Sequence, residues 1–242
     1  MDLPTDMQHQ AMGYDRTATM FSPEGTIIQV EYAEKATKWG NPSIGMVCSD
    51  GVFIITDKRN EDKLVISKSS NKIYEIDSHI IASAAGVVSD ARILVERAQV
   101  MAQQYRVTYD SQIVPELVIK DIANLEQQFT QYGGARPFGV FLMIAGINEA
   151  KKPEIYISNV SGNYFSYYAS AIGENDEKIK EKLRESYKHD LTIKKGVKLA
   201  LDIFKEVEEN KFNIDRFEIA YIEKDDIQIK RLEGGELKNF AK

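Results

Sequence analysis

The order of strand-like and helix-like segments is the feature that most constrains the fold of this chain. Apolar runs with the period of strands and helices predict four strands, two helices, three strands, two helices and two strands. In chain order they span 43–49, 52–57, 72–76, 79–84, 89–105, 115–132, 138–147, 154–158, 164–168, 176–187, 192–208, 216–222 and 227–232. Asp50-Gly51 and Asp77-Ser78 predict hairpin turns. Helices grouped in pairs favour packed antiparallel sheets covered by helix layers, so the sequence predicts an α+β fold.

A further helix is predicted ahead of the first strand. Ser22-Pro23-Glu24-Gly25 has proline and glycine at the positions typical of a type I turn. Thr26 and Gln29 then form a capping box, and Gly40 and Pro42 end the helix. Its apolar face is narrow and consists of Ile27, Val30, Ala33 and Thr37. We therefore expect this helix to lie against another surface rather than to anchor a core of its own.

Composition excludes several functional classes. Hydrophobic residues make up 43% and charged residues 28% of the 242 residues, which is typical of a globular protein. A net charge of −6 argues against a nucleic-acid partner, because phosphate binding needs clustered Lys and Arg. No apolar run approaches the roughly 18 residues of a membrane span, and the first residues lack the features of a signal peptide. With Cys48 as the single cysteine, we expect a cytoplasmic protein without a membrane partner.

Residue patterns that carry common catalytic chemistry are absent from the sequence. There is no glycine-rich phosphate loop, no G-x-S-x-G and no H-E-x-x-H. His9, His79 and His189 are scattered without metal-ligand spacing, so we expect no metal and no other cofactor. Cys48 falls in the middle of a predicted strand without a nearby base, which favours a structural role. The residues alone therefore identify no catalytic constellation.

Six motifs at fixed spacing nevertheless point to one family. They are YDR at 14–16, FSPEG at 21–25, QVEYA at 29–33, GVVSDAR at 86–92, TQYGGARPFGV at 130–140 and AIG at 171–173. Through these motifs nearly the whole chain resembles the α-subunits of the 20S proteasome, most closely the archaeal kind. The run YDR-x4-FSP-x-G-x3-QVEYA is highly specific, because several unusual tripeptides recur at set distances.

The resemblance implies a four-layer αββα sandwich, the fold of the N-terminal-nucleophile hydrolases, with an additional N-terminal helix. The element order predicted above agrees with this fold. We expect one domain over 14–242, in which 14–40 form a gate hinge and the N-terminal helix. The polar residues 1–13 are expected to be a mobile gate tail.

The resemblance also implies that this chain does not itself cut peptides. In the catalytic β-subunits of this fold, the nucleophile is a threonine that begins the first strand, and its free α-amine acts as the base. The matching position here is on or about Asn41, which has no hydroxyl and follows forty residues. Asp57 and Lys72 occupy the assisting positions. The alternatives are an active N-terminal-nucleophile hydrolase of the same fold and a free-standing binding protein.

In the family, seven α-subunits form a ring, and two such rings cap two rings of β-subunits. The leading helix fills the cleft of the lost active site, and the N-terminal segments gate the axial pore. The resemblance assigns Tyr14, Asp15, Pro23 and Tyr32 to the cluster that holds the gate open, and pairs Asp15 with Arg16 of a neighbour. Taken singly, Pro23 is also typical of a plain turn, and Tyr32 of ordinary helix packing.

Lys72, Gly86 and Val87 match the family's docking site for activator C-termini, between adjacent α-subunits. A Lys ammonium can pair with a terminal carboxylate, although Lys72 could also be a remnant of a catalytic ancestor. This chain departs from the family at Glu34, where a basic residue is common, and at Pro42, which cannot donate a ladder hydrogen bond.

The resemblance assigns Tyr132, Gly133 and Gly134 to the loop that narrows the channel below the gate. Glycines suit a constriction because they permit tight turns and leave room for a threading chain, and they also suit a helix C-cap. The implied partners are other α-subunits, β-subunits, ATPase or other activators with docking C-terminal tails, and unfolded polypeptides. The implied role is structural and gating, within ATP-dependent protein degradation.

Overall fold

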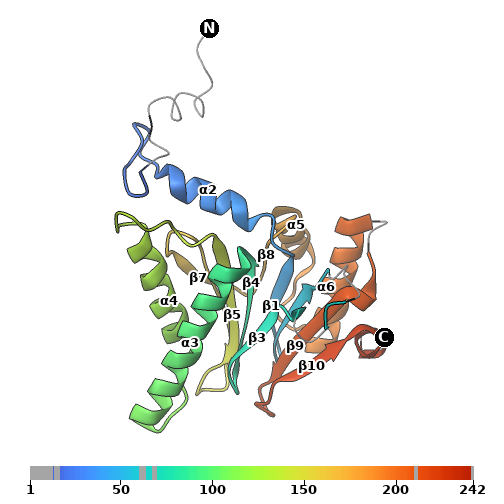
Figure 1. Cartoon of the computed structure of the whole chain (residues 1–242). Coiled ribbons are helices and arrows are strands. Elements are labelled where there is room, and N and C mark those ends of the chain that lie inside the picture. Colours follow the sequence, from blue (N-terminus) through green and yellow to red (C-terminus); the bar gives the residue numbers. More distant parts are fainter. Residues whose placement is uncertain (1–12, 14–16, 60–63, 67–69, 210–211, 241–242) are drawn as a thin grey trace.

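The chain folds into four layers, and the computed structural model describes residues 13, 17–59, 64–66, 70–209 and 212–240. Two antiparallel sheets lie face to face, and a pair of helices covers the outer face of each (Figure 1). Helices α3 (Val88–Tyr109) and α4 (Pro115–Phe129) cover one sheet. Helices α5 (Asp176–Ser186) and α6 (Ile193–Glu208) cover the other. The predicted αββα sandwich is therefore confirmed.

Each sheet has five strands among the described residues. The first sheet has the order β10 (Lys230–Glu233), β9 (Phe217–Glu223), β2 (Gly51–Asp57), β1 (Ser43–Cys48) and β8 (Ala169–Ile172). The second has the order β3 (Ile73–Asp77), β4 (Ile80–Gly86), β5 (Val140–Ile147), β6 (Pro153–Ser158) and β7 (Tyr164–Ser166). One side of the sandwich thus ends in β3 and β10, and the opposite side ends in β7 and β8.

Both predicted hairpins are present, but each turn differs by one residue from the position that the sequence predicts. Cys48 pairs with Gly51, and Asp77 pairs with Ile80, so Ser49-Asp50 and Ser78-His79 are the turn residues. Gly51 stays within the ladder because a Cβ there would lie 2.1 Å from the carbonyl oxygen of Ile222 on β9. Glycine is therefore required at position 51 because β9 approaches closely, and not because of the turn.

Three apolar clusters fill the spaces between the four layers. Val52 and Ile54 of β2 point into the cluster between the two sheets. Phe53 and Ile55 point to the opposite side, into the cluster beneath α5 and α6. A third cluster joins the second sheet to α3 and α4. Strands that are buried on both faces read as continuous apolar runs, which is why these strands were predictable.

Helix α2 (Ile28–Thr37) lies across one end of the sandwich (Figure 1). The predicted turn before it is confirmed by a hydrogen bond from the Gly25 N–H to the Ser22 carbonyl oxygen, 2.9 Å long. The predicted capping box is wrong. The N-cap is Ile27, without a side-chain cap, and Thr26 Oγ1 instead lies 3.0 Å from Ser22 Oγ. The buried residues are Ile28 and Thr37, so the predicted narrow face is only partly right.

Three described elements were not predicted from the sequence: β8, the short 3-10 helix η4 (Ile214–Arg216) and the C-terminal helix α7 (Gly234–Phe240). Strand β8 is four residues long and is held by pairing with β1, and α7 begins with two glycines. Among the described helices, none combines the length and apolar character that crossing a bilayer requires.

Candidate functional site

The site of interest is the junction at which α2 passes into β1. Gly40 lies against the end of β4, where a Cβ on Gly40 would be only 2.2 Å from the Gly86 nitrogen. The Gly40 carbonyl oxygen accepts a hydrogen bond from the Glu174 N–H, 2.9 Å away. Close backbone packing on two sides therefore fixes the end of α2, and only glycine fits there.

Asn41, which the resemblance places on or about the position of the nucleophile, carries an amide. Asn41 Nδ2 donates to the Lys58 carbonyl oxygen at 3.1 Å. The next residue, Pro42, uses its carbonyl oxygen to accept from the Asp57 N–H at 3.2 Å. The nearest hydroxyl along the strand is Ser43, which is fully buried and bonded to Thr56 and Ser83, each at 2.9 Å. Over residues 40–48, which the structure describes throughout, no exposed hydroxyl therefore stands at the start of β1.

Asp57, whose N–H bonds to Pro42 next to Asn41, has its carboxylate in a buried charge network. Its carboxylate accepts from Arg59 Nε at 2.7 Å and from Arg216 Nε at 3.0 Å. Both guanidinium groups also bond to Glu208, at 3.2 and 3.0 Å. Burial raises the pKa of Glu208, and the negative charge of Asp57 raises it further. The Asp57 carboxylate is therefore engaged by two arginine side chains at once.

Lys72 and Gly86 do come together, with Asn41, in one small cavity. Its volume is about 20 Å³, room for about one water molecule. The Lys72 N–H donates to Glu218 Oε1 at 2.5 Å, which fixes the backbone at the start of β3. Among the described residues, nothing makes a hydrogen bond or ion pair with the Lys72 ammonium group. The cavity therefore presents a cation that the described part of this chain leaves unbalanced.

Val87, the third residue of the predicted docking site, does not line this cavity. Its N–H donates to the Gly139 carbonyl oxygen at 2.9 Å, and its side chain packs towards Gly139. Val88 lines the cavity instead and is 57% exposed. The glycine at 86 has a φ of +126°, which turns the chain so that Val87 faces inward.

Glu34 lies in a different hollow from Lys72. It lines a cavity with Lys38, Phe141 and the beginning of α5, and this cavity shares no residue with the one at Lys72. Within one chain, the structure therefore does not bring Glu34 and Lys72 together.

Two of the five predicted gate residues belong to the described chain. Pro23 is exposed in the turn before α2. Tyr32 is half-buried on α2, and the ammonium of Lys35 lies 5.4 Å from its ring centroid. Tyr14, Asp15 and Arg16, which the sequence assigns to the same cluster, lie outside the described residues.

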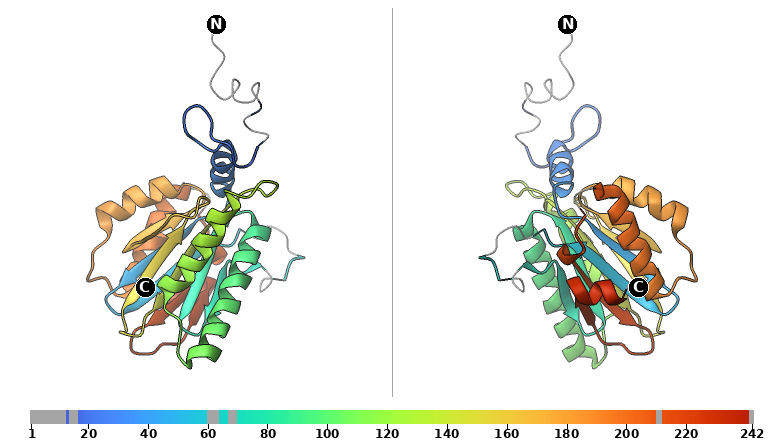
Figure 2. Two further views of the ribbon diagram at one scale, coloured as in Figure 1. Left: turned by 90° about the vertical axis from the view of Figure 1, so that its left-hand side faces the viewer. Right: turned by 90° about the vertical axis from the view of Figure 1, so that its right-hand side faces the viewer.

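The predicted channel loop follows α4 at the same end of the molecule as α2 (Figures 1 and 2). Tyr132 is exposed, and its N–H donates to the Gln128 carbonyl oxygen at 3.1 Å. Gly134 has a φ of +88°, which favours glycine, whereas a Cβ on Gly133 would meet nothing within 4 Å. The loop is therefore both the end of the helix and a projecting surface feature.

One ion pair that sequence reasoning missed joins two of the family motifs. Arg136 Nη1 and Nη2 donate to the Asp90 carboxylate at 2.6 and 2.7 Å, and the Gly139 N–H donates to it at 2.9 Å. Burial alone would raise the pKa of Asp90, but the bonds from Arg136 and Gly139 outweigh burial and lower it. The sequence signal for this pair was a charged residue without an assigned role in each of two motifs: Asp90 in the motif at 86–92 and Arg136 in the motif at 130–140. The pair ties the channel loop to the start of α3.

Cys48 was the remaining candidate for reactive chemistry in the sequence. Burial raises the pKa of the Cys48 thiol to about 12, and the charge of Asp50 adds to the effect, so this cysteine is a neutral core residue. Over the ranges that the structure describes, no group of three or more His, Cys, Asp or Glu side chains is arranged to hold a metal ion.

Comparison with known proteins gives consistent matches along the chain. A family model for the N-terminal signature of A-type proteasome subunits matches residues 14–36, and one described as "Proteasome subunit" matches residues 37–222. A proteasome alpha subunit of Methanosarcina thermophila is 40% identical over 230 residues, which cover 95% of this chain and 93% of that protein. The Archaeoglobus fulgidus protein is 41% identical with the same coverage. The Pyrococcus horikoshii protein is 39% identical, over 94% of this chain and 86% of its own length.

Proposed function

The chain belongs to the proteasome subunit family, as an alpha-type member, and on this premise we propose that it is a structural and gating subunit of the outer ring of a proteolytic particle. It forms a ring of seven with other α-subunits, stacks on β-subunits and controls the passage of unfolded polypeptides. It takes part in ATP-dependent degradation without cutting peptides itself.

The observation that carries the non-catalytic role is the amide at Asn41. Its side chain is engaged by the Lys58 carbonyl oxygen, and the neighbouring hydroxyl of Ser43 is buried. The chain runs from α2 through Gly40 into Asn41, so the nitrogen of Asn41 is a peptide nitrogen and not a free α-amine. A threonine-type mechanism needs both a hydroxyl and that amine.

The gating role is supported by the placement of helix α2 and the loop at Tyr132–Gly134 on one end of the molecule (Figure 1). In this proposal residues 1–13 are the gate tail, and residues 14–40 are the hinge and the helix of the domain 14–242. Tyr14, Asp15, Pro23 and Tyr32 hold the open gate, and Arg16 pairs with Asp15 of a neighbour.

The docking role is supported by the ammonium of Lys72 beside Gly86, for which the described residues supply no ion-pair partner. The cavity around it is too small for a peptide tail, so a neighbouring subunit has to complete the site. The terminal carboxylate of an ATPase or other activator would supply the missing negative charge. Val87 supports this site from beneath, through Gly139.

The purified chain tests this proposal directly, alone and after mixing with a matched β-subunit. Electron microscopy should show seven-fold rings, and fluorogenic peptides should be hydrolysed only when the β-subunit is present. Sustained turnover by the chain alone would instead indicate an active hydrolase, and a monomer under all conditions would contradict the ring.

A further inference from the structure

Arg59, two residues beyond the end of β2, has an unusual backbone conformation. Its φ is +36°, in the left-handed region that residues with a Cβ rarely adopt. Its own side chain and backbone are bonded around this conformation: the N–H and Nε of Arg59 donate to the Asp57 carboxylate at 3.1 and 2.7 Å. A strained residue that its surroundings hold in place points to a positional role for its side chain.

The guanidinium group of Arg59 joins three elements of the fold. Asp57 is the last residue of β2, and Glu208, whose Oε1 accepts from Arg59 Nη2 at 3.2 Å, is the last residue of α6. The third partner is Glu174, in the connection between β8 and α5, which accepts from Arg59 Nη1. The carboxylates of Asp57 and Glu208 are buried, whereas that of Glu174 is 44% exposed. The group therefore links a buried charge network to the start of α5.

The connection that carries Glu174 is also the segment against which α2 ends. The Glu174 N–H donates to the Gly40 carbonyl oxygen at 2.9 Å. The preceding residue, Gly173, has a φ of +94°, and a Cβ there would lie 2.6 Å from the Asn41 carbonyl oxygen. Residues 173 and 174 thus pack directly on the backbone that leads from α2 into β1. By binding the Glu174 side chain, Arg59 holds this support in place.

A second contact reaches the same backbone from the other side of Arg59. Asn41 Nδ2 donates at 3.1 Å to the carbonyl oxygen of Lys58, which belongs to the peptide group that joins Lys58 to Arg59. The link between Gly40 and Asn41 is therefore held twice, once by Glu174 and once by this peptide group. Both contacts depend on where the backbone and side chain of Arg59 lie.

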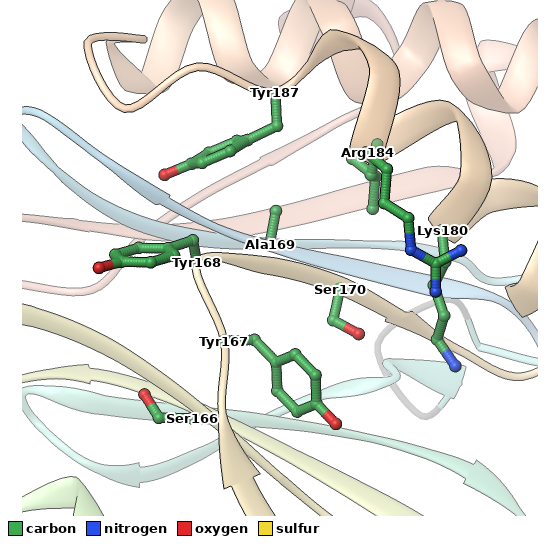
Figure 3. A pocket seen from close by; sticks show the side chains of 9 residues that line it. Ser166, Tyr167, Tyr168, Ala169, Ser170, Lys180, Arg184 and Tyr187 are labelled. Atoms are coloured by element: carbon green, nitrogen blue, oxygen red, sulfur yellow. The ribbon is translucent and has the colours of Figure 1, made fainter.

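The basic side chains of α5 do not replace Arg59 in this arrangement. Lys180, one turn along the helix, pairs with Asp176 and Glu177 at 2.6 and 3.4 Å. Figure 3 shows that Lys180 lies beside a separate hollow of about 340 Å³, whose lining does not include Glu174. Within the part of the chain that the structure describes, the cation that pairs with Glu174 is that of Arg59.

We propose that Arg59 is a positioning residue for helix α2: through Glu174 and the peptide group at Lys58, it sets the place at which α2 leaves the sandwich. The inference rests on the proposed gating function. Pro23 lies in the turn before α2 and Tyr32 lies on α2 itself, so the proposed cluster that holds the gate open is built on this helix. A looser end of α2 lowers the fraction of open gates.

Glu174→Gln tests the positioning role, because it removes the charge that Arg59 binds and keeps the shape of the side chain. Peptide hydrolysis is measured in particles reconstituted with one β-subunit preparation. The variant should slow hydrolysis by up to about fivefold, the largest shift that a partly exposed ion pair gives to a two-state equilibrium. The same substitution in a chain that lacks residues 1–13 should leave hydrolysis unchanged, because no tail is left to position.

Glu206→Gln is the matched control. Glu206 is on α6, is 60% exposed and pairs with Lys182 at 3.0 Å, so the variant also removes one surface ion pair, but away from α2. It should change hydrolysis in neither the full nor the shortened chain. Hydrogen exchange in the assembled particles gives a second measurement. Amides at the end of α2 should exchange several-fold faster in Glu174→Gln and at the parent rate in Glu206→Gln.

The inference and the proposed function fail in different ways. If removal of residues 1–13 does not change hydrolysis, the gating function fails and the inference falls with it. If that removal speeds hydrolysis, the gating function stands. The inference is then overturned when Glu174→Gln does not slow the full-length particle, when it slows the shortened one equally, or when exchange at the end of α2 stays at the parent rate.

Discussion

Helices α6 and α2 show two ways in which this chain uses a helix. Helix α6 buries seven of its 16 residues against the first sheet. Helix α2 buries only two of its ten, Ile28 and Thr37, although close packing at Gly40 fixes its end. A helix with a wide apolar face is stabilised by the core of its own domain, whereas one with a narrow face depends on other surfaces.

The same contrast holds between the buried interior, which stabilises the fold, and the end that carries α2, where the proposed functional residues lie. The charged groups of the network of Asp57, Arg59, Arg216 and Glu208 are paired with one another within the chain. The end that carries α2 and the loop at Tyr132 is left half-exposed, and there the proposed gate and docking site lie. Substitutions in the interior should therefore lower stability, and substitutions at the rim should change assembly and gating instead.

The largest expected effect is that of Asp57→Ala. The substitution removes a fully buried carboxylate from Arg59 and Arg216, which are 30% and 26% exposed and keep Glu208, so it should cost about 1.5–3 kcal/mol of unfolding free energy. Urea denaturation of the isolated chain measures it. The exposed Asp225→Ala should stay within about 0.5 kcal/mol of the parent chain. Equal losses for both variants would show that the network does not stabilise the interior.

Gly40→Ala tests whether close packing at Gly40 fixes the end of α2 against the sandwich. Its new Cβ would lie 2.2 Å from the Gly86 backbone nitrogen, so the end of α2 has to move, at a cost of about 1–3 kcal/mol. Gly133→Ala is the matched control, because a Cβ there meets nothing within 4 Å. Thermal unfolding compares the two. A Gly40→Ala chain as stable as Gly133→Ala would mean that α2 is not clamped at this junction.

Glu126→Gln tests the interior through its pH dependence. Glu126 on α4 is fully buried, and Ser158 is the polar side chain beside it. Burial outweighs the opposing effect of Ser158 and raises the pKa of Glu126 from 4.5 to about 8, so the folded chain retains a proton that the unfolded chain loses above the lower value. Stability should therefore fall as pH rises between these values, by up to about 1.4 kcal/mol per pH unit.

The glutamine variant should lose this slope, and its unfolding free energy should exceed that of the parent most at the upper end of the range. Urea denaturation at a series of pH values provides the comparison. Parallel stability profiles for the two chains would rule out a buried, protonated Glu126.

Lys72→Ala should have the smallest effect on stability and a selective effect on function. Its ammonium makes no bond within the described residues, so its loss should change unfolding free energy by no more than about 0.5 kcal/mol. Activator stimulation of a reconstituted particle should weaken while rings still form. Lys120→Ala, on the exposed side of α4, is the control. Full stimulation of the Lys72→Ala particle would remove Lys72 from the docking site.

Secondary structure was predicted correctly where the local apolar pattern reflects burial. It was predicted wrongly where a contact with a distant part of the chain determines the local structure. The apolar runs of β2 and β5 reported their two buried faces directly. By contrast, Gly51 was assigned to a turn, whereas β9 requires it within the ladder. Strand β8 was missed because its four residues depend on pairing with β1.

The residues of the candidate site also fall into those that the sequence identifies and those that only the fold identifies. The sequence shows that residue 41 is an asparagine without a hydroxyl, but its place on or about the nucleophile position was predicted from the resemblance. The ion pair between Asp90 and Arg136 joins residues 46 positions apart and became visible only in the fold. The inward direction of Val87 likewise depends on the backbone turn at Gly86.

The central claim is that the N-terminal end of this chain gates a chamber in which other subunits cut. The most direct measurement compares peptide hydrolysis by particles reconstituted with the full chain and with a chain that lacks residues 1–13, while the β-subunits are kept the same. Hydrolysis of a short fluorogenic peptide reports passage through the gate, and particle assembly is checked by electron microscopy. Faster hydrolysis by the shortened chain is the predicted result, whereas an unchanged rate in fully assembled particles would contradict the account.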